Sequence, residues 1–321
     1  MNNEFDIIKK YFTFAGSRHD VVLAGGDDCA SVIVPEKKQL MITTDTLVSG
    51  VHFPEQTAAE DIAYKAVMVN LSDLAAMGAN PAWMTLAITL PDIDEDWLSR
   101  FSRSLSQVLQ RFNVSLIGGD TTRGPLSITI QAMGLCDAGR VLQRDQAEAG
   151  DSIFVTGYPG DAAIGLAAIL DNLDETELQS CINRLNRPEA RVNFAQELVA
   201  YSRCAIDVSD GLVADLGHIV DASACGARVS LSDIPVSSAA RYYFDNYCKS
   251  VVDWPMLLSA GDDYELCFTV HRSNDSAVEE LAKKHHLQIT RIGEITESQQ
   301  LVFLDEKNQA ISFDSTGYKH F

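Results

Sequence analysis

The feature that most constrains this chain is a series of short apolar runs, each of which is followed within a few residues by Asp. Such runs end at Asp45 and Asp120 in the first half of the chain and at Asp207 and Asp210 in the second. Apolar runs bounded by turn residues are typical of buried strands. We therefore expect several strands whose ends bring carboxylates together.

Segments with helical spacing lie between these runs. In 61–77 the positions Ile62, Ala66, Val69 and Asp73 recur every three or four residues, and Gly78 follows where a helix C-cap belongs. The patterns predict helices over 4–14, 61–77, 95–112, 212–223 and 276–285, with a run of helices over 162–201. They predict strands over 29–34, 40–44, 83–90, 114–117, 126–135, 152–156, 205–208, 228–231 and 266–270, and strands ending near 295 and 303.

Strands and helices alternate in both halves of the chain, which predicts two α/β domains with mixed sheets. A length of 321 residues suits two domains. The segment 137–150, rich in Arg, Gln and Ala, is the best boundary. We predict an N-terminal domain over 1–137, a connecting segment over 138–150 and a C-terminal domain over 151–321.

The charge of the chain excludes some partners. Lys plus Arg is 25 and Asp plus Glu is 45, a formal net charge of −20. Nucleic acids and anionic membranes are bound through basic faces, so we expect neither as a partner. The seven cysteines are scattered without a Cys-x-x-Cys pair, which favours reduced thiols in a cytoplasmic protein. We expect no membrane span, because Gly78, Asn80 and Pro81 interrupt the longest uncharged stretch.

Common nucleotide-binding and hydrolase motifs are absent from the sequence. It has no Gly-x-x-x-x-Gly-Lys-Ser/Thr loop, no Gly-x-Gly-x-x-Gly after a strand, no His-Arg-Asp or Asp-Phe-Gly, and no Gly-x-Ser-x-Gly. Any phosphate chemistry must therefore use another arrangement.

The strand-end carboxylates suggest that arrangement. An Asp beside Gly is often only a turn, and an Asp before a helix is often only an N-cap. The repetition favours a site, because like charges about 4 Å apart repel by about 4 kcal/mol at an effective dielectric constant near 20. Carboxylate and hydroxyl oxygens are ligands suited to Mg²⁺ or Mn²⁺. Several divalent cations in an acidic cleft indicate phosphoryl transfer.

The motifs that surround these residues resemble those of the thiamine-monophosphate kinase family, in the family's order and from about residue 5 to the last residue. They are Gly-Asp-Asp-Cys-Ala at 26–30, Thr-Thr-Asp-Thr-Leu-Val at 43–48, Gly-Val-His-Phe at 50–53, Asn-Leu-Ser-Asp-Leu-Ala-Ala-Met-Gly at 70–78, Gly-Gly-Asp-Thr-Thr-Arg-Gly at 118–124, Ile-Asp-Val-Ser-Asp-Gly-Leu at 206–212, Asp-Asp-Tyr-Glu-Leu at 262–266 and Gly-Tyr-Lys-His-Phe at 317–321.

The resemblance implies an AIR synthase-like fold, in which the N-terminal domain joins that of a second subunit to close a shared β-barrel. The nucleotide sites would lie near this interface of a homodimer. It also implies the reaction: ATP and thiamine monophosphate give ADP and thiamine diphosphate, the last step of making that cofactor. The transfer would be direct and in line, without a phosphoenzyme or a catalytic base, and with several Mg²⁺ ions.

The resemblance also implies roles for individual residues. ATP would be contacted by Gly119, Asp120, Arg144 and Ser209. Thiamine monophosphate would be contacted by His52, Asp262 and Tyr318. The metal ligands would be Asp28, Thr43, Thr44, Asp45, Asp73, Asp120, Asp207 and Asp210. The sequence departs from the family pattern at 262, where Glu is expected in many members, and at 318, where Trp is frequent.

Two alternatives remain at this point. One is another ATP-using enzyme of the superfamily, such as an AIR synthase or a selenophosphate synthase. The latter is disfavoured because Cys29 has no nearby Lys in a flexible glycine-rich segment. The other is a non-catalytic regulator that binds Mg²⁺ and a nucleotide but forms no ADP.

Overall fold

The computed structural model describes residues 4–14, 18–313, 317 and 318. The chain divides into two compact units. Unit 1 comprises Met1–Leu74 and Ala79–Gly139, and unit 2 comprises Ala75–Gly78 and Arg140–Phe321.

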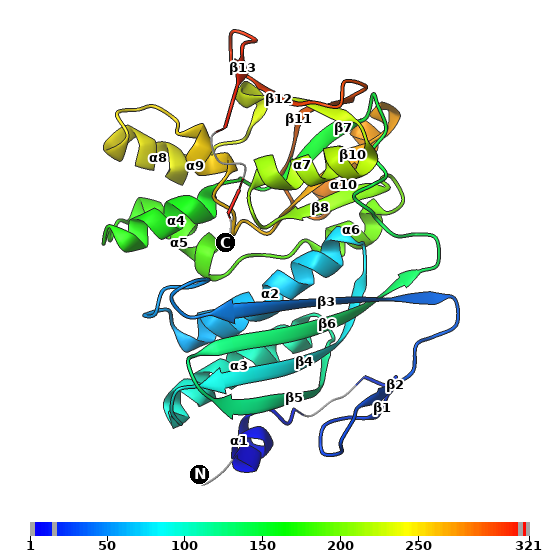
Figure 1. Cartoon of the computed structure of the whole chain (residues 1–321), viewed down its shortest axis with the longest axis vertical. Coiled ribbons are helices and arrows are strands. Elements are labelled where there is room, and N and C mark those ends of the chain that lie inside the picture. Colours follow the sequence, from blue (N-terminus) through cyan, green and yellow to red (C-terminus); the bar gives the residue numbers. More distant parts are fainter. Residues whose placement is uncertain (1–3, 15–17, 314–316, 319–321) are drawn as a thin grey trace. The chain divides into compact units, whose positions relative to one another are not determined.

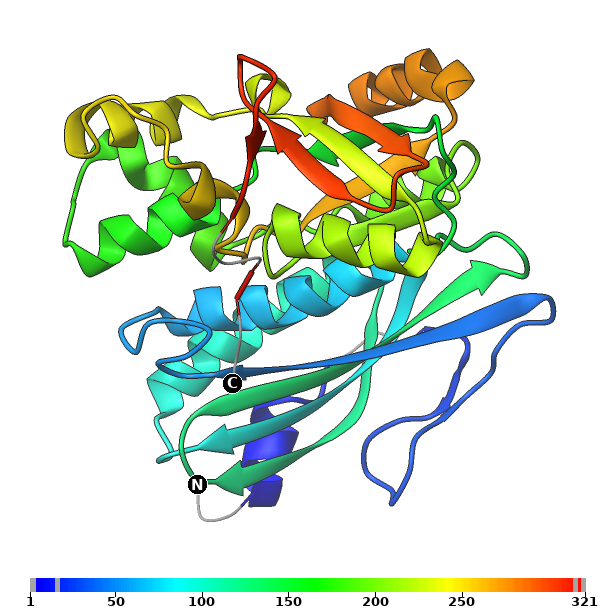
Figure 2. The same cartoon turned by 45° about the horizontal axis from the view of Figure 1, so that its top comes forward.

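Unit 1 is built on a four-stranded mixed sheet with the order β3-β6-β4-β5. Helices α2 and α3 cover one face of this sheet, and the other face is open within the unit (Figures 1 and 2). A short hairpin of β1 and β2 precedes the sheet. The elements are α1 (Glu4–Tyr11), β1 (Val21–Leu23), β2 (Ser31–Val32), β3 (Lys38–Val48), α2 (Ala59–Ala76), β4 (Asn80–Leu90), α3 (Glu95–Arg111), β5 (Ser115–Arg123) and β6 (Ser127–Asp137).

Local sequence explains the two covering helices. Helix α3 buries Leu98, Phe101 and Leu105 at helical spacing, and the Asp94 carboxylate caps its first turn by accepting from the N–H of Asp96 and of Trp97 at 3.0 Å. Helix α2 ends at Ala76 and is terminated by Gly78, whose φ of 69° is left-handed and whose N–H donates to the Ala75 carbonyl. The predicted helix over 61–77 and its glycine cap are confirmed.

Unit 2 contains a seven-stranded mixed sheet with the order β13-β12-β9-β11-β7-β10-β8. Strands β9 and β12 are parallel, and the other neighbours are antiparallel. The strands are β7 (Ser152–Thr156), β8 (Cys204–Val208), β9 (Gly226–Ser230), β10 (Glu265–Val270), β11 (Ile289–Thr296), β12 (Leu301–Leu304) and β13 (Ala310–Ile311). The α-helices are α4 (Asp161–Leu170), α5 (Gln179–Asn186), α6 (Val192–Leu198), α7 (Leu212–Ser223), α8 (Ser238–Tyr247), α9 (Trp254–Leu258) and α10 (Asp275–Lys284). Two mixed α/β units confirm the predicted fold class.

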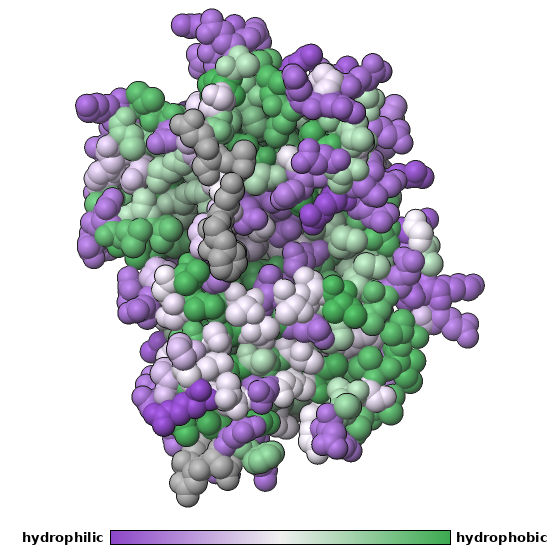
Figure 3. All heavy atoms as spheres, in the orientation of Figure 1, coloured by the Kyte–Doolittle hydropathy of each residue, from purple (hydrophilic) through white to green (hydrophobic). Residues whose placement is uncertain are grey.

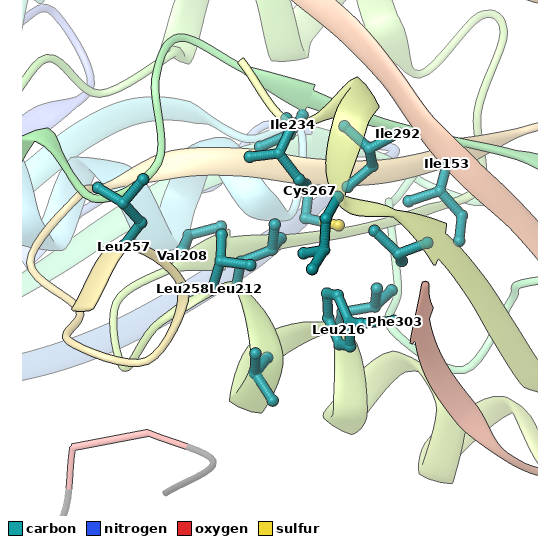
Figure 4. Close-up of a cluster of buried hydrophobic side chains, with 14 of the residues drawn as sticks. Ile153, Val208, Leu212, Leu216, Ile234, Leu257, Leu258, Cys267, Ile292 and Phe303 are labelled. Atoms are coloured by element: carbon teal, nitrogen blue, oxygen red, sulfur yellow. The ribbon is translucent and has the colours of Figure 1, made fainter. Parts of the chain in front are cut away.

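The core of unit 2 packs α7 against the sheet. Val208 at the end of β8, Leu212 and Leu216 on α7, and Cys267 on β10 are buried together (Figure 4). Every residue of β7, β8 and β10 is buried, which is why these strands appear in the sequence as nearly continuous apolar runs.

The structure corrects several predicted boundaries. Strand β3 has 11 residues, where 40–44 was predicted, and β5 continues through the glycine pair to Arg123, where 114–117 was predicted. Both extensions carry polar side chains on the open face, so they lack the apolar run that marks a buried strand. Helices α8 and α9 were not predicted, and neither was hairpin strand β1.

Candidate active site

Unit 1 brings three of the predicted metal ligands together beneath α2. Thr43 and Asp45 are two residues apart on β3 and so face the same side. The Thr43 hydroxyl donates a hydrogen bond to Asp73 Oδ2 on α2. Burial, reinforced by the charge of Asp73, raises the pKa of Asp45 to about 6. Two carboxylates and a hydroxyl therefore lie close together in a partly buried group, and the two carboxylate charges repel each other.

Other predicted ligands lie on the open face of the same sheet. Thr44 alternates with Thr43 along β3 and is exposed. Asp120 on β5 is opposite Ala87 on β4, which is opposite Thr129 on β6. Side chains that face each other across a sheet share a face, so Asp120 lies on the open side. The sheet therefore separates Thr44 and Asp120 from the Thr43–Asp45–Asp73 group.

Gly119 has a steric reason to be glycine. A Cβ at this position would lie 1.9 Å from the Leu86 carbonyl oxygen on β4. Gly118, in contrast, has open space around it. Gly119 thus permits the close approach of β4 and β5, a reason that the sequence did not reveal.

Asp28 lies in the loop between β1 and β2 and is exposed. Its N–H donates to the Asp27 carboxylate at 2.8 Å. The loop therefore carries Asp28 at the surface, on the hairpin.

His52 follows β3 in a tight turn. Its Nδ1 accepts a hydrogen bond from the Val48 N–H at 3.0 Å, so the neutral ring carries its proton on Nε2. The buried Lys65 ammonium donates to the His52 carbonyl at 3.1 Å. The Val48 contact therefore fixes the ring with a donor at its outer nitrogen, and the Lys65 contact fixes the backbone that carries the ring.

Unit 2 builds a second group at the end of β8. Asp207 is buried on the strand, and Ser209 and Asp210 follow it in the loop. One oxygen of the buried Asp215 carboxylate accepts from the N–H groups of Ser209, Asp210 and Gly211 at 3.0–3.2 Å. Burial and the charge of Asp210 raise the pKa of Asp215 to about 7. Asp215 thus fixes the loop that carries Ser209 and Asp210.

The substrate residues predicted in unit 2 meet that loop. The Asp262 N–H donates to the Ser209 carbonyl at 2.8 Å, and the Tyr318 N–H donates to the Asp210 carbonyl at 3.1 Å. The Asp262 carboxylate accepts from the Tyr264 hydroxyl at 3.1 Å. Asp262 and Tyr318 therefore contact the same loop between β8 and α7. The rest of the C-terminal motif, 319–321, lies outside the described residues.

Arg144 is placed elsewhere in unit 2. Its carbonyl accepts from Ser223 Oγ at 3.0 Å, at the C-terminal end of α7, and its side chain is exposed. The Ser209 loop precedes the other end of α7, whose 12 residues span about 18 Å. The structure does not bring the backbones of Arg144 and Ser209 together.

Residues of the Thr43–Asp45–Asp73 group fit a divalent cation by their donor chemistry. In the part of the chain that the structure describes, no three His, Cys, Asp or Glu side chains are grouped as a metal site. The group here instead combines a hydroxyl with two carboxylates, all hard oxygen ligands. One turn before Asp73, the buried Asn70 donates from Nδ2 to the Ala66 carbonyl, and its Oδ1 has no hydrogen-bond partner. A hydrated cation would offset the repulsion between the two carboxylates, and a water molecule on it could donate to the unpartnered Asn70 Oδ1.

Unit 2 also contains a buried group of charged side chains around Glu265 that was not predicted from the sequence. Glu265 is fully buried and accepts hydrogen bonds from Arg184, Arg191 and Thr156. Burial alone would raise the pKa of Glu265, but the charges of Arg191 and Arg184 outweigh it and hold the pKa below its usual value. Next to it, Asp263 is buried against the start of α4. Nothing in the sequence distinguishes these carboxylates from the exposed ones around them.

Comparison with known proteins places this geometry in a family. Residues 26–136 match the family described as AIR synthase related protein, N-terminal domain, and residues 148–306 match AIR synthase related protein, C-terminal domain. The two units and their strand-end carboxylates thus define an AIR synthase related protein.

Full-length relatives narrow this class. The chain is 47% identical over 322 residues to thiamine-monophosphate kinase of Salmonella typhimurium, covering 99% of this chain and 98% of the relative. Among solved structures it is similar to thiamine-monophosphate kinase from Stenotrophomonas maltophilia, with a TM-score of 0.84, 42% identity and coverage of 92% and 93%. It is also similar to AaThiL complexed with AMPPCP and TMP, with a TM-score of 0.80, 27% identity and coverage of 99% and 96%. The chain belongs to the thiamine-monophosphate kinase family.

Among the described residues, no helix is both long enough and apolar enough to cross a bilayer.

Proposed function

We propose that this protein transfers the γ-phosphoryl group of ATP to thiamine monophosphate, forming ADP and thiamine diphosphate. The protein is a kinase whose acceptor is itself a phosphate. The observation that carries the proposal is 47% identity to a thiamine-monophosphate kinase along 99% of the chain. A related structure was solved in complex with the ATP analogue AMPPCP and TMP, which correspond to the two substrates of this reaction.

The proposed metal ligands would hold several Mg²⁺ ions. They are Thr43, Asp45 and Asp73 on one face of the unit 1 sheet, Thr44 and Asp120 on its other face, Asp28 on the hairpin, and Asp207 and Asp210 in unit 2. Mg²⁺ bound there would neutralise the charge that develops on the phosphate oxygens during transfer. The raised pKa of Asp45 supports this assignment, because a cation would relieve the repulsion between the Asp45 and Asp73 charges.

The proposed substrate contacts follow from the chemistry of each side chain. His52 offers an Nε2–H donor, and Asp262 offers a braced carboxylate. The Tyr318 ring, 46% exposed, offers an aromatic face to the thiazolium cation. For ATP, Gly119, Asp120 and Ser209 would contact the nucleotide, and the Arg144 guanidinium can bind phosphate through two parallel hydrogen bonds.

No general base is needed in this proposal. The attacking oxygen belongs to the phosphate of thiamine monophosphate and is already anionic. The residues that bind both substrates would therefore act by positioning them in line and by excluding water.

A homodimer is part of the proposal. The open face of the unit 1 sheet carries Ile42, which is 58% exposed, and the hairpin beside it exposes Val22 and Ile33 by 64% and 56%. Figure 3 shows hydrophobic surface over this part of unit 1. A second copy paired on this face would cover these side chains. Light scattering of the purified protein should give about twice the 35.1 kDa chain mass.

The test of function is ADP release from ATP and Mg²⁺ with and without thiamine monophosphate, followed by identification of the thiamine product. We expect ADP only when thiamine monophosphate is present, with one thiamine diphosphate formed for each ADP. ATP binding without this turnover would refute the proposal, and aminoimidazole precursors and selenide would then test the other superfamily reactions.

A further inference from the structure

The turn before β10 holds an unusual backbone. Gly261, Asp262 and Tyr264 all have φ in the left-handed region, at 79°, 67° and 51°. Left-handed conformations are unfavourable for residues with a side chain, and two of them in three residues persist only where surrounding contacts impose them. Contacts around this turn must therefore hold it in place.

Backbone contacts supply part of the answer. The N–H groups of Asp262 and Tyr264 donate to the carbonyls of Ser209 and Val208, each at 2.8 Å. A Cβ on Gly261 would lie 2.4 Å from the Ser209 carbonyl oxygen, so glycine is required for this approach. The turn is thus joined to the loop that follows β8.

The Asp263 side chain supplies the other attachment. It is 4% exposed, and its Oδ2 accepts from the Gly160 N–H at 2.8 Å while Oδ1 accepts from the Ala162 N–H at 3.4 Å. These are free amide groups at the start of α4, where a carboxylate is favoured. Asp263 therefore ties the turn to a helix that is 103 residues away in sequence.

The side chain of Asp262, next to Asp263, indicates what this turn does. It is only partly buried, and the Tyr264 hydroxyl donates to its carboxylate at 3.1 Å. The two adjacent carboxylates of Asp262 and Asp263 thus have different roles. One is buried and bonded to the fold, and the other is presented toward solvent in a fixed direction.

We propose that Asp263 is a positioning residue that holds Asp262 and Tyr264 in the geometry needed to bind the phosphorylated acceptor substrate. This inference rests on the proposed function, because it takes thiamine monophosphate as that substrate. Asp263 itself does not touch the substrate.

The test compares two isosteric variants of buried carboxylates. Asp263→Asn replaces one of the two accepting oxygens with an NH₂ donor. Asp161→Asn is the matched control, because Asp161 is also buried, 5% exposed, at the start of α4, but its carboxylate accepts from Ser237 Oγ at 2.6 Å, on a segment other than the turn. Steady-state kinetics would give kcat and separate KM values for thiamine monophosphate and ATP.

We expect Asp263→Asn to raise the KM for thiamine monophosphate by roughly tenfold, the fold-change of one lost hydrogen bond to a charged group. The KM for ATP should stay within about twofold. Asp161→Asn should leave both KM values unchanged. A drop in kcat of Asp263→Asn with both KM values unchanged would overturn the proposal, because that is what a structural role alone would produce.

Hydrogen exchange keeps the inference separate from the proposed function. In the wild-type protein without substrates, the amides of Asp262 and Tyr264 should be protected, and Asp263→Asn should expose them while Asp161→Asn does not. Unprotected amides in the wild-type protein would refute positioning even if Asp263→Asn does not fold. Protected amides in a wild-type protein that forms no thiamine diphosphate would instead show that the proposed function, and the binding role that rests on it, is wrong.

Discussion

Replacing Asp45 by Asn should stabilise the metal-free protein while it abolishes turnover. The ordinary pKa of an aspartate is 3.8, and burial with the charge of Asp73 raises that of Asp45 to about 6. The folded state therefore holds the Asp45 proton more tightly than the unfolded state. By linkage, the free energy of unfolding is highest below pH 4 as far as this group is concerned, and it falls as pH rises toward 6 and above.

The size of the effect follows from the same values. Each pKa unit corresponds to about 1.4 kcal/mol, so a rise from 3.8 to about 6 costs the metal-free fold roughly 3 kcal/mol at pH 8. About half of this cost should already be present at pH 5, between the two values. Asp45→Asn keeps the shape of the side chain and removes the charge. It should therefore raise the free energy of unfolding by up to ~3 kcal/mol at pH 8 and by about half as much at pH 5.

Urea unfolding in the presence of a chelator measures this difference. Trp83 and Trp97 both lie in unit 1, so tryptophan fluorescence reports largely on the unit that contains Asp45. The control is Asp92→Asn, because the Asp92 side chain of unit 1 is 84% exposed and its removal should have no comparable pH-dependent effect. Adding Mg²⁺ should then stabilise the wild type more than Asp45→Asn.

Two results would refute this reasoning. If Asp45→Asn is less stable than the wild type at pH 8 without metal, burial and the charge of Asp73 do not disfavour the charged form of Asp45 in the folded state. If the difference between the two proteins is the same at pH 5 and pH 8, the Asp45 proton is not the source of the effect. Normal kcat in Asp45→Asn would sink its role as a metal ligand.

Three further changes test other parts of the structure. Asn70→Leu removes the orphaned buried acceptor, so it should stabilise the metal-free protein by about 1 kcal/mol in urea unfolding and weaken Mg²⁺ binding in calorimetry, whereas Asn246→Leu, which loses the same type of bond to a helix carbonyl on an exposed surface, should leave Mg²⁺ binding unchanged. Glu265→Gln leaves two arginines beside a buried neutral group and should lower the free energy of unfolding by about 3–5 kcal/mol, whereas Glu294→Gln, with exposed arginine partners, should lower it by less than about 1 kcal/mol. Asp207→Asn should abolish ADP formation at any ATP concentration while circular dichroism stays unchanged, and a normal kcat would remove it from the metal site.

The fold class could be predicted because apolar runs and helical spacing survive in the sequence wherever an element is buried. Strands β7, β8 and β10 are buried on both faces, and each was predicted within one or two residues. The same criterion shortened β3, because Thr44 and Thr46 face outward from it. It also missed α8, whose buried face of Ala239, Ala240 and Tyr243 is too short and too mixed to show a clear period.

The faces of the unit 1 sheet could not be predicted in the same way. Alternation along β3 shows that Thr43 and Thr44 point to opposite sides. It does not show which side α2 covers, since that depends on how distant segments pack. The separation of Asp120 and Thr44 from Asp45 and Asp73 is therefore information that only the three-dimensional structure supplies.

The carboxylates at the strand ends are of two physical kinds. Asp45 and Asp210 are partly exposed and carry charges that oppose a neighbouring Asp, as ligand positions do before a cation binds. Asp215 and Asp263 are buried, and each accepts hydrogen bonds from backbone N–H groups of a loop or a helix start. The sequence does not distinguish the two kinds, because each includes an Asp that closely follows β8 or closely precedes β10 or lies near the end of β3. Asp215 fixes the loop from which Asp210 projects, and Asp263 fixes the turn that carries Asp262. A substitution in the buried pair should therefore change the position of the site, whereas one in the exposed pair should change its charge.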